Sequence, residues 1–273
     1  MEIVNVNDVQ LACEIQGNGE IPLVMVHGSW VSRRNWDLVV PHLKNSFRVV
    51  TYDRRGHSES ERPTRQGSIR EDVDDLAALI EHLGLAPAWV AGQSFGGSIT
   101  FRLAGERPDL IRGIIVHEPP FLSLLDDDPS IASMLEEAGQ KVGTVVEQIR
   151  TGDHRGAAEQ FVETVALGPG MWAQLPTEFQ KTMIENAPTY LDEVNDPEQL
   201  AFDPDWIKAF TRPCLLTVGD HSPPLFPPVV TKLAEVVPSA EVNTFTKSGH
   251  IPQIEQSKAY AEAITAFIRR HTT

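Results

Sequence analysis

Residues 89–97 read WVAGQSFGG, and this stretch decides the fold. The pattern Gly92-x-Ser94-x-Gly96 follows an apolar run, AWVA, and opens a helix-like run, SITFRLAGE. A G-x-S-x-G pattern between a strand and a helix is typical of a sharp turn that strains the serine backbone and lifts its hydroxyl above a sheet. The two glycines leave out side chains that would collide across that turn. The stretch predicts that Ser94 is a nucleophile at a strand-to-helix junction.

Outward from this stretch, short apolar runs alternate with amphipathic ones. The expected strands are 2–6, 11–14, 23–26, 48–52, 88–91, 113–117, 214–218 and 241–245. The first two are joined at Asn7-Asp8, a hairpin-type turn. Most of the others are almost continuously apolar, which suits strands buried on both faces of a parallel sheet. The alternation predicts an α/β fold with a doubly wound sheet.

The helix expected after residue 68 carries signals at both ends. Ser68 and Glu71 form a capping-box pattern, in which the hydroxyl and the carboxylate each satisfy a free backbone N–H group. Apolar residues then fall on one helix face, and Gly84 supplies a left-handed stop.

One segment, 119–208, breaks the alternation, because it contains helix-like runs and no convincing strand. It holds 17 acidic and 5 basic residues, so most of the chain's net charge of -15 lies there. We expect a core domain formed by 1–118 and 209–273, with 119–208 as a helical cap over the carboxyl edge of the sheet, where α/β proteins bind ligands. The alternative is an acidic, solvated helical layer without a role in substrate selection.

The composition excludes several classes of function. A net charge of -15 repels nucleic acid and anionic membranes. The N-terminus resembles no signal peptide, and no apolar run approaches the roughly 20 residues of a membrane span. Cys13 and Cys214 lie in apolar runs, as core residues do. We expect a cytoplasmic protein without a disulfide, and the sequence leaves a homodimer open.

A serine nucleophile needs a base, and His250 is the best candidate. It lies in KSGHIP, after the last expected strand and before the terminal helix-like run. The eight other histidines lie in turn motifs, at exposed helix or tail positions, or without a matching context. We predict that His250 takes the proton of Ser94.

Acyl transfer also needs backbone donors for the developing oxyanion. The natural pair is the N–H of Phe95, next to the nucleophile, and the N–H of Ser29 in the loop VHGSW; Gly28 and Trp30 are possible substitutes for Ser29. We expect His27 to brace that loop. The turn YDRRGHS, residues 52–58, has charged residues that we expect to hold the loop rather than to touch substrate.

Four segments, HGSW, YDRRGHS, GQSFGG and SGH, resemble in order and spacing those of the α/β-hydrolase family. The resemblance covers nearly the whole chain. It implies an eight-stranded, mostly parallel sheet with helices on both faces and a helical cap inserted after the sixth strand. It also implies an acyl-enzyme mechanism that uses no cofactor and no metal.

The third member of the triad departs from the commonest family pattern. The acid usually lies three residues after the glycine that ends the seventh strand, and Ser222 stands at that place. Asp220 is one candidate. We favour Glu118, in the run HEPP after the sixth strand, because zearalenone-type lactone hydrolases and certain haloalkane dehalogenases carry the acid there, and HEP is locally similar to the former. Glu118 could instead be a buried carboxylate at the cap hinge.

These residues favour hydrolysis of a carboxylic ester or lactone, with Ser94, His250 and Glu118 as the triad and Ser29 and Phe95 as oxyanion donors. A C–C bond hydrolase or a cofactor-free perhydrolase would use the same triad, and some hydrolase-fold hormone receptors retain one with slow turnover. The acidic cap favours a neutral, apolar small-molecule substrate. Four cap aromatics could line its pocket or form cap core: Trp172, Phe179, Tyr190 and Trp206.

Overall fold

The computed structural model describes residues 1–207 and 210–272, and its centre is one eight-stranded sheet. The strand order is β1-β2-β4-β3-β5-β6-β7-β8. β2 pairs antiparallel with β1 and β4, and all the other neighbours are parallel. The strands are β1 (Glu2–Val6), β2 (Val9–Gln16), β3 (Ile21–Val26), β4 (Phe47–Tyr52), β5 (Ala88–Gln93), β6 (Ile111–His117), β7 (Cys214–Gly219) and β8 (Ala240–Phe245). The predicted α/β sheet is confirmed.

Each of the eight expected strands is present, seven of them one to four residues longer than predicted. The turn between β1 and β2 lies at Asn7 and Asp8, whose φ angles are 47° and 60°. Both residue types tolerate this left-handed region, which two-residue hairpins require. The predicted hairpin is therefore confirmed.

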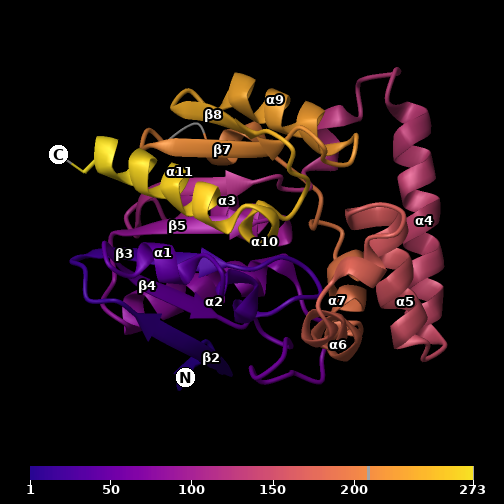
Figure 1. Cartoon of the computed structure of the whole chain (residues 1–273), viewed down its shortest axis with the longest axis horizontal. Coiled ribbons are helices and arrows are strands. Elements are labelled where there is room, and N and C mark those ends of the chain that lie inside the picture. Colours follow the sequence, from indigo (N-terminus) through magenta and orange to yellow (C-terminus); the bar gives the residue numbers. More distant parts are fainter. Residues whose placement is uncertain (208–209, 273) are drawn as a thin grey trace.

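Helices cover both faces of the sheet (Figure 1). One face is covered by α2 (Ile69–His82), α3 (Phe95–Glu106) and α9 (Phe226–Val236), and the other by α1 (Val40–Leu43) and α11 (Ser257–Arg270). β3 shows why the strands read as continuous apolar runs. Its Val24 and Val26 pack into the first layer, while Leu23 and Met25 pack into the second. Residues 23–26 of this strand are therefore all buried, alternately on one side and the other.

The start of α2 corrects one detail of the sequence analysis. Ser68 Oγ accepts a hydrogen bond from the Glu71 N–H at 3.4 Å, as predicted. The Glu71 carboxylate is bound instead by the guanidinium groups of Arg55 and Arg65. Charged donors outcompete a backbone N–H for a carboxylate, so only half of the capping box forms. Gly84, with φ of 61°, follows the end of the helix as expected.

The chain between β6 and β7 contains helices and no strand in its described part. These are η2 (Leu122–Leu125), α4 (Ala132–Arg150), α5 (His154–Phe161), η3 (Val162–Ala166), η4 (Trp172–Gln174), α6 (Thr177–Asn186), α7 (Thr189–Asn195) and α8 (Pro204–Ile207). Helices α4 to α7 lie together beyond one end of the strands (Figure 1). The domain boundary expected between Lys208 and Ala209 lies outside the described residues.

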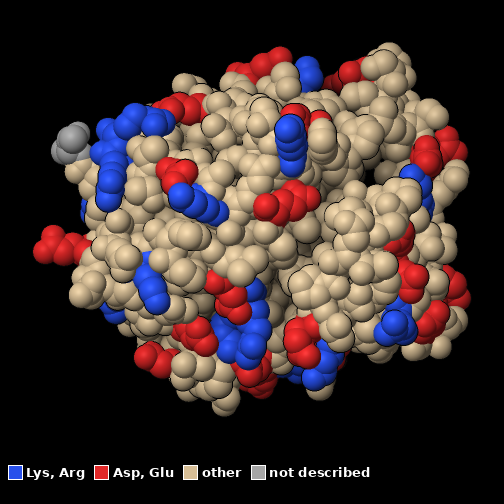
Figure 2. Space-filling model, viewed as in Figure 1, with Lys and Arg blue, Asp and Glu red and all other residues tan. Residues whose placement is uncertain are grey.

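The molecular surface carries charges of both signs. On the face shown in Figure 2, acidic and basic side chains are interspersed, including over the inserted helices, and form no single block. None of the helices in the described ranges has the length and apolar character to cross a bilayer. Cys13 and Cys214 are buried and not joined in a disulfide.

Two glycines allow α3 to lie close against the sheet. A Cβ atom on Gly96 would be 2.3 Å from the carbonyl oxygen of Val26 and 2.5 Å from that of His27. A Cβ on Gly92 would be 2.3 Å from the carbonyl oxygen of Gly96. Both contacts are with backbone atoms, which cannot move aside without shifting β3 or α3.

We expect Gly96→Ala to lower the free energy of unfolding by about 1–3 kcal/mol or more, because it overpacks this junction. Gly139→Ala is the matched control. Gly139 lies in α4 with no neighbour within 4 Å of an added Cβ, so the alanine should raise stability by about 0.5–1 kcal/mol. Denaturant titration measures both, and equal effects of the two changes would contradict the prediction.

Candidate active site

Ser94 occupies the turn between β5 and α3, and it is the residue that precedes the first turn of the helix. Its φ and ψ are 54° and -126°, a region that L-residues seldom adopt. Such strain persists only where the surroundings enforce it, and it is common at functional sites. The backbone at Ser94 thus has the conformation that its motif predicts.

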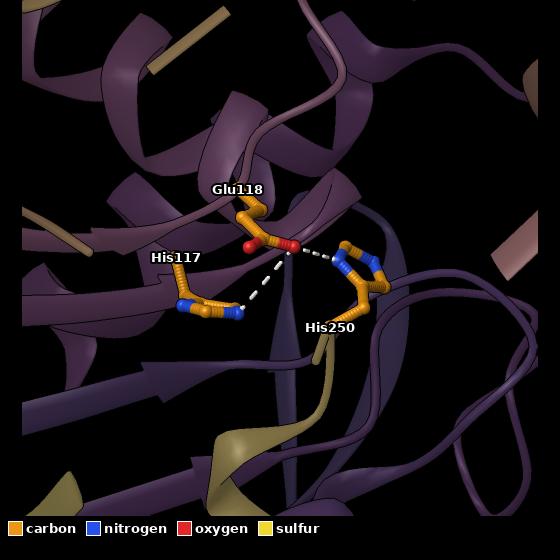
Figure 3. A group of neighbouring side chains, drawn as sticks. All are labelled: His117, Glu118 and His250. Atoms are coloured by element: carbon orange, nitrogen blue, oxygen red, sulfur yellow. Dashed lines mark hydrogen bonds and ion pairs between the residues drawn. The ribbon is translucent and has the colours of Figure 1, made fainter. Parts of the chain in front are cut away.

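His250 and Glu118 meet although they are 132 residues apart (Figure 3). The Glu118 Oε2 atom lies 2.6 Å from His250 Nδ1, within the hydrogen-bond distance expected from the sequence. Glu118 directly follows β6, and His250 lies in the loop between β8 and α10 (Pro252–Glu255). The ring of Phe226 stacks on the imidazole with centroids 4.2 Å apart. One hydrogen bond and one stacked ring therefore fix the orientation of His250.

The other carboxylate oxygen of Glu118 is held by the turn after β7. Oε1 accepts hydrogen bonds from the Gly219 N–H at 2.8 Å and from Ser222 Oγ at 2.5 Å. Burial acts to raise the pKa of Glu118, but His117, His250 and Ser222 outweigh it and hold that pKa below its usual value. The carboxylate is therefore ionised at neutral pH.

Asp220, the alternative acid, points elsewhere. Its Oδ1 accepts a hydrogen bond from the Lys247 N–H at 2.6 Å, and its side chain is 39% exposed. Asp220 thus binds the backbone of the loop between β8 and His250 at an exposed position. The structure thus brings Glu118, and not Asp220, to the Nδ1 atom of His250.

His117 is a third buried group at this point, and the sequence analysis assigned it no role. Its Nε2 lies 3.6 Å from Glu118 Oε2, and its Nδ1 lies 2.9 Å from Thr217 Oγ1. Burial lowers the pKa of His117 to about 4, so the ring is neutral near pH 7. Its only signal in the sequence was its position beside Glu118.

The ligand atoms of His117, Glu118 and His250 lie within 4.8 Å of one another, close enough to share a metal ion (Figure 3). All three side chains are buried, and Glu118 Oε2 already shares a proton with His250 Nδ1 at 2.6 Å. A metal ion would have to replace that proton and part the two groups. The arrangement therefore fits a hydrogen-bonded acid–histidine pair better than a metal centre.

The loop that carries Ser29 passes directly beside the nucleophile. A Cβ on Gly28 would be 2.9 Å from Gln93 Oε1 and 3.1 Å from the Cβ of Ser94, so a larger residue would require these side chains to shift. His27 braces the loop as expected, because its Nε2 accepts a hydrogen bond from the Arg54 N–H at 3.0 Å. The N–H of Phe95 is in the first turn of α3, where backbone donors lack partners within the helix.

Ser94 and His250 line the same cavity of about 320 Å³, together with Ser29 and Phe95. Most of its wall is apolar and comes from the inserted helices and the turn after β7. The wall includes Leu122, Met134, Val142, Phe161, Val194 and Leu225. A smaller cavity of about 50 Å³ opens from the same two residues on the side of Asn35 and Met183. A molecule bound at Ser94 would thus have the larger, mostly apolar cavity on one side and the smaller cavity on the other.

The four aromatic residues that the sequence left between a pocket-lining and a core role lie in different surroundings. Tyr190 lines the larger cavity and Phe179 the smaller one. Trp172 belongs to the buried apolar cluster of the inserted helices. Trp206 packs under the guanidinium of Arg102, which lies 4.3 Å from its ring centroid.

The chain matches known proteins over most of its length. It is 28% identical over 272 residues to the dihydrolipoyllysine-residue acetyltransferase component of the acetoin cleaving system of Pseudomonas putida, covering 94% of this chain but only 66% of that component's length. It is 23% identical to the mouse sn-1-specific diacylglycerol lipase ABHD11, covering 93% of this chain and 83% of the lipase. The narrower likeness to zearalenone-type lactone hydrolases stays a prediction.

Among solved structures, an esterase from Thermogutta terrifontis superimposes with a TM-score of 0.79 and 24% identity, covering 100% of this chain and 99% of the esterase. At that identity the likeness establishes the fold alone. The family model described as alpha/beta hydrolase fold matches residues 21–257, which include both Ser94 and His250. The chain therefore belongs to the alpha/beta hydrolase fold family.

Proposed function

We propose that the protein is a serine hydrolase that cleaves a carboxylic ester or lactone through an acyl-enzyme intermediate. One observation carries the proposal. A strained serine and a histidine hydrogen-bonded to a buried carboxylate line the same apolar cavity. This is the set of groups that nucleophilic acyl transfer requires.

In the proposed mechanism, Ser94 Oγ attacks the carbonyl carbon while His250 Nε2 takes its proton. Glu118 holds the Nδ1–H and stabilises the imidazolium that forms, with an ionised oxygen at 2.6 Å. The N–H groups of Ser29 and Phe95 receive the oxyanion. His250 then protonates the leaving alcohol, and water attacks the acyl-enzyme with His250 again as base. This chemistry uses the chain's own residues and needs no cofactor.

The substrate that we propose is a neutral, apolar small molecule, and residues 119–208 act as the cap that selects it. The apolar wall of the cavity supports this, since burying apolar surface contributes about 25 cal/mol per Å². The acidic surplus of the cap and the buried carboxylate of Glu193 in the cavity wall both disfavour carboxylates. The net charge of -15 repels nucleic acid and anionic membranes, so we propose a soluble substrate. We also propose action in the cytoplasm, a reducing compartment that suits the free Cys13 and Cys214.

Ser94→Ala should lower kcat for a short-chain p-nitrophenyl ester by a factor on the order of 10⁶, because the nucleophile is lost. Circular dichroism and thermal unfolding check that the fold is retained. Full activity in the variant would exclude the mechanism. A burst without steady-state turnover in the unmodified protein would favour a slow-turnover receptor.

Glu118→Ala should lower kcat by a factor on the order of 10⁴, since His250 would lose the partner that fixes its tautomer. Asp220→Ala is the control, and it should change kcat by less than about ten-fold because the Asp220 carboxylate contacts the Lys247 N–H and the exposed His221. Steady-state kinetics of the two purified variants decide between them. A larger loss in the Asp220 variant would place the functional acid in the turn after β7.

Neutral esters should have a kcat/KM at least about ten-fold higher than anionic esters of equal size, because a carboxylate would be desolvated beside Glu193. The test compares two esters of one dicarboxylic acid at pH 7. One is the methyl p-nitrophenyl diester, and the other is the p-nitrophenyl monoester, which keeps a free carboxylate. A preference for the anionic member would refute the proposed substrate class.

A further inference from the structure

The Glu118 carboxylate lies between two imidazole rings, and the proposed mechanism uses only one of them (Figure 3). Its Oε2 atom lies 2.6 Å from Nδ1 of His250 and 3.6 Å from Nε2 of His117. The side chains of His117 and Glu118 have no exposed surface. A buried carboxylate stays ionised only when N–H or O–H groups direct their protons toward it. The nitrogen that His117 turns toward Glu118 therefore affects the acid directly.

His117 and Glu118 meet where β6 ends. In an extended strand, the side chains of neighbouring residues point to opposite faces of the sheet. Glu118 directly follows β6 and departs from this pattern, since its φ of 45° is left-handed. Its Oε2 comes within 3.6 Å of the ring that precedes it in the chain. His117 thus contacts the acid from the same strand end, whereas His250 reaches it from a distant loop.

The ring of His117 is neutral near pH 7, because burial lowers its pKa to about 4. A neutral imidazole has one N–H donor and one bare nitrogen that accepts. Nδ1 lies 2.9 Å from the Thr217 hydroxyl oxygen, which in turn lies 3.4 Å from the carbonyl oxygen of Val116. The hydroxyl can give its proton to either acceptor, and Nδ1 is the nearer one. If it donates to Nδ1, the ring carries its own proton on Nε2.

The surroundings of Nε2 favour the same form. The Glu118 oxygen at 3.6 Å and the backbone oxygens of Gly249 and His250 all favour a proton on this ring. A bare nitrogen would be repelled by these acceptors, whereas an N–H group is attracted to them. None of them forms a hydrogen bond of standard geometry with Nε2 in the described chain, so the N–H acts on Glu118 through its dipole rather than through one short bond.

The remaining contacts of the His117 ring do not need its nitrogens. The rings of Phe245 and Tyr260 pack around it, with centroids at 6.4 and 6.2 Å. An apolar side chain of similar size would pack against them without the cost of burying an imidazole. Among the described neighbours, the nitrogens serve Thr217 on one side and the acid–histidine pair on the other.

We propose that His117 is a positioning residue, whose Nε2–H keeps the Glu118 carboxylate ionised and directed at Nδ1 of His250. Thr217 fixes the ring through the hydroxyl that donates to its other nitrogen. The inference rests on the proposed function, because it adds a residue to the machinery of that reaction. His117 lines neither of the two cavities beside Ser94, so it acts only through the acid and the base.

Two substitutions of similar length separate the N–H group from the packing. In His117→Gln the amide can place an N–H donor where imidazole Nε2 stands, whereas the side chain of His117→Met has no donor. With a p-nitrophenyl ester at pH 7, His117→Met should lower kcat about ten-fold or more and change KM by less than about two-fold, as expected for a lost donor to a charged group that does not bind substrate. His117→Gln should stay within about three-fold of the unmodified kcat. Thermal unfolding checks the fold of both variants.

A second readout does not depend on turnover. The proton between His250 Nδ1 and Glu118 lies in a short, charge-assisted hydrogen bond and should give a far-downfield proton NMR signal, identified by its loss in Glu118→Ala. His117→Met should move this signal upfield, and His117→Gln should retain it. In the unmodified protein, the nitrogen shifts of isotopically labelled histidines should place the proton of His117 on Nε2.

Equal losses of kcat in the two variants, with the downfield signal unchanged in both, would show a packing role and overturn the inference. A His117 proton on Nδ1 in the unmodified protein would also overturn it, whether or not the variants fold. If the NMR results are as expected but no ester is hydrolysed, the proposed function fails and the positioning of Glu118 by His117 stands. Rapid hydrolysis with a signal that His117→Met leaves unchanged overturns the inference and leaves the proposed function standing.

Discussion

The close contact of α3 with the ends of β3 and β5 is the constraint on which the site depends. Gly96 lies against the carbonyl oxygens of Val26 and His27, so the helix begins immediately where the strand ends. No room remains for a relaxed connection, and Ser94 takes up the change of direction in its own backbone. Its N–H is bonded to the carbonyl oxygen of His117 at 2.8 Å, which ties the strained residue to β6. The strain at Ser94 is therefore maintained by packing on two strands.

The hydrogen bond between the Ser94 N–H and the His117 carbonyl oxygen also helps to position Glu118, the next residue in the chain. β6 lies between β5 and β7, so a residue directly after β6 is flanked by the serine turn and by the turn after β7. Glu118 has φ of 45°, a left-handed conformation that turns the chain away from the sheet and toward the inserted helices. Its carboxylate reaches the Gly219 N–H, Ser222 and His250 together. Ser222, at the position where the family resemblance leads us to expect the acid, donates instead to the carboxylate that follows the neighbouring strand β6.

Much of this could be predicted from the sequence, because the decisive signals are local. The turn around Ser94, the apolar strands and the stop at Gly84 each depend on neighbouring residues. The proximity of Glu118, rather than Asp220, to His250 was also predicted, from the local family resemblance of HEP and from the longer side chain of glutamate. Other features were not. The inserted helices also line the cavity with Glu193, which looks like an ordinary helical residue until the fold brings it beside Ser94.

Ion pairs between residues far apart in the sequence were the hardest features to predict. The half-formed capping box at Ser68 is an example, because no local pattern shows that Arg55 will take the Glu71 carboxylate. Arg54 is a second example. The sequence indicated only that Arg54 holds its loop. In the structure it binds both Asp72 of α2 and Glu193 of α7, and Glu193 is 139 residues from Arg54 in the sequence. Such pairs form only after the sheet has set the distances between its loops.

Arg54 shows how the inserted helices and the core act on the same reacting atoms. Its guanidinium lies 4.5 Å from the centroid of the Phe95 ring, whose backbone N–H is a proposed oxyanion donor. It also holds Glu193 in the cavity wall. Removing one partner from a buried ion pair is costly, about 3–5 kcal/mol, because a charge is left uncompensated. A shift of α7 would therefore be resisted by Arg54, and the position of α7 is coupled through this one side chain to the geometry around Ser94.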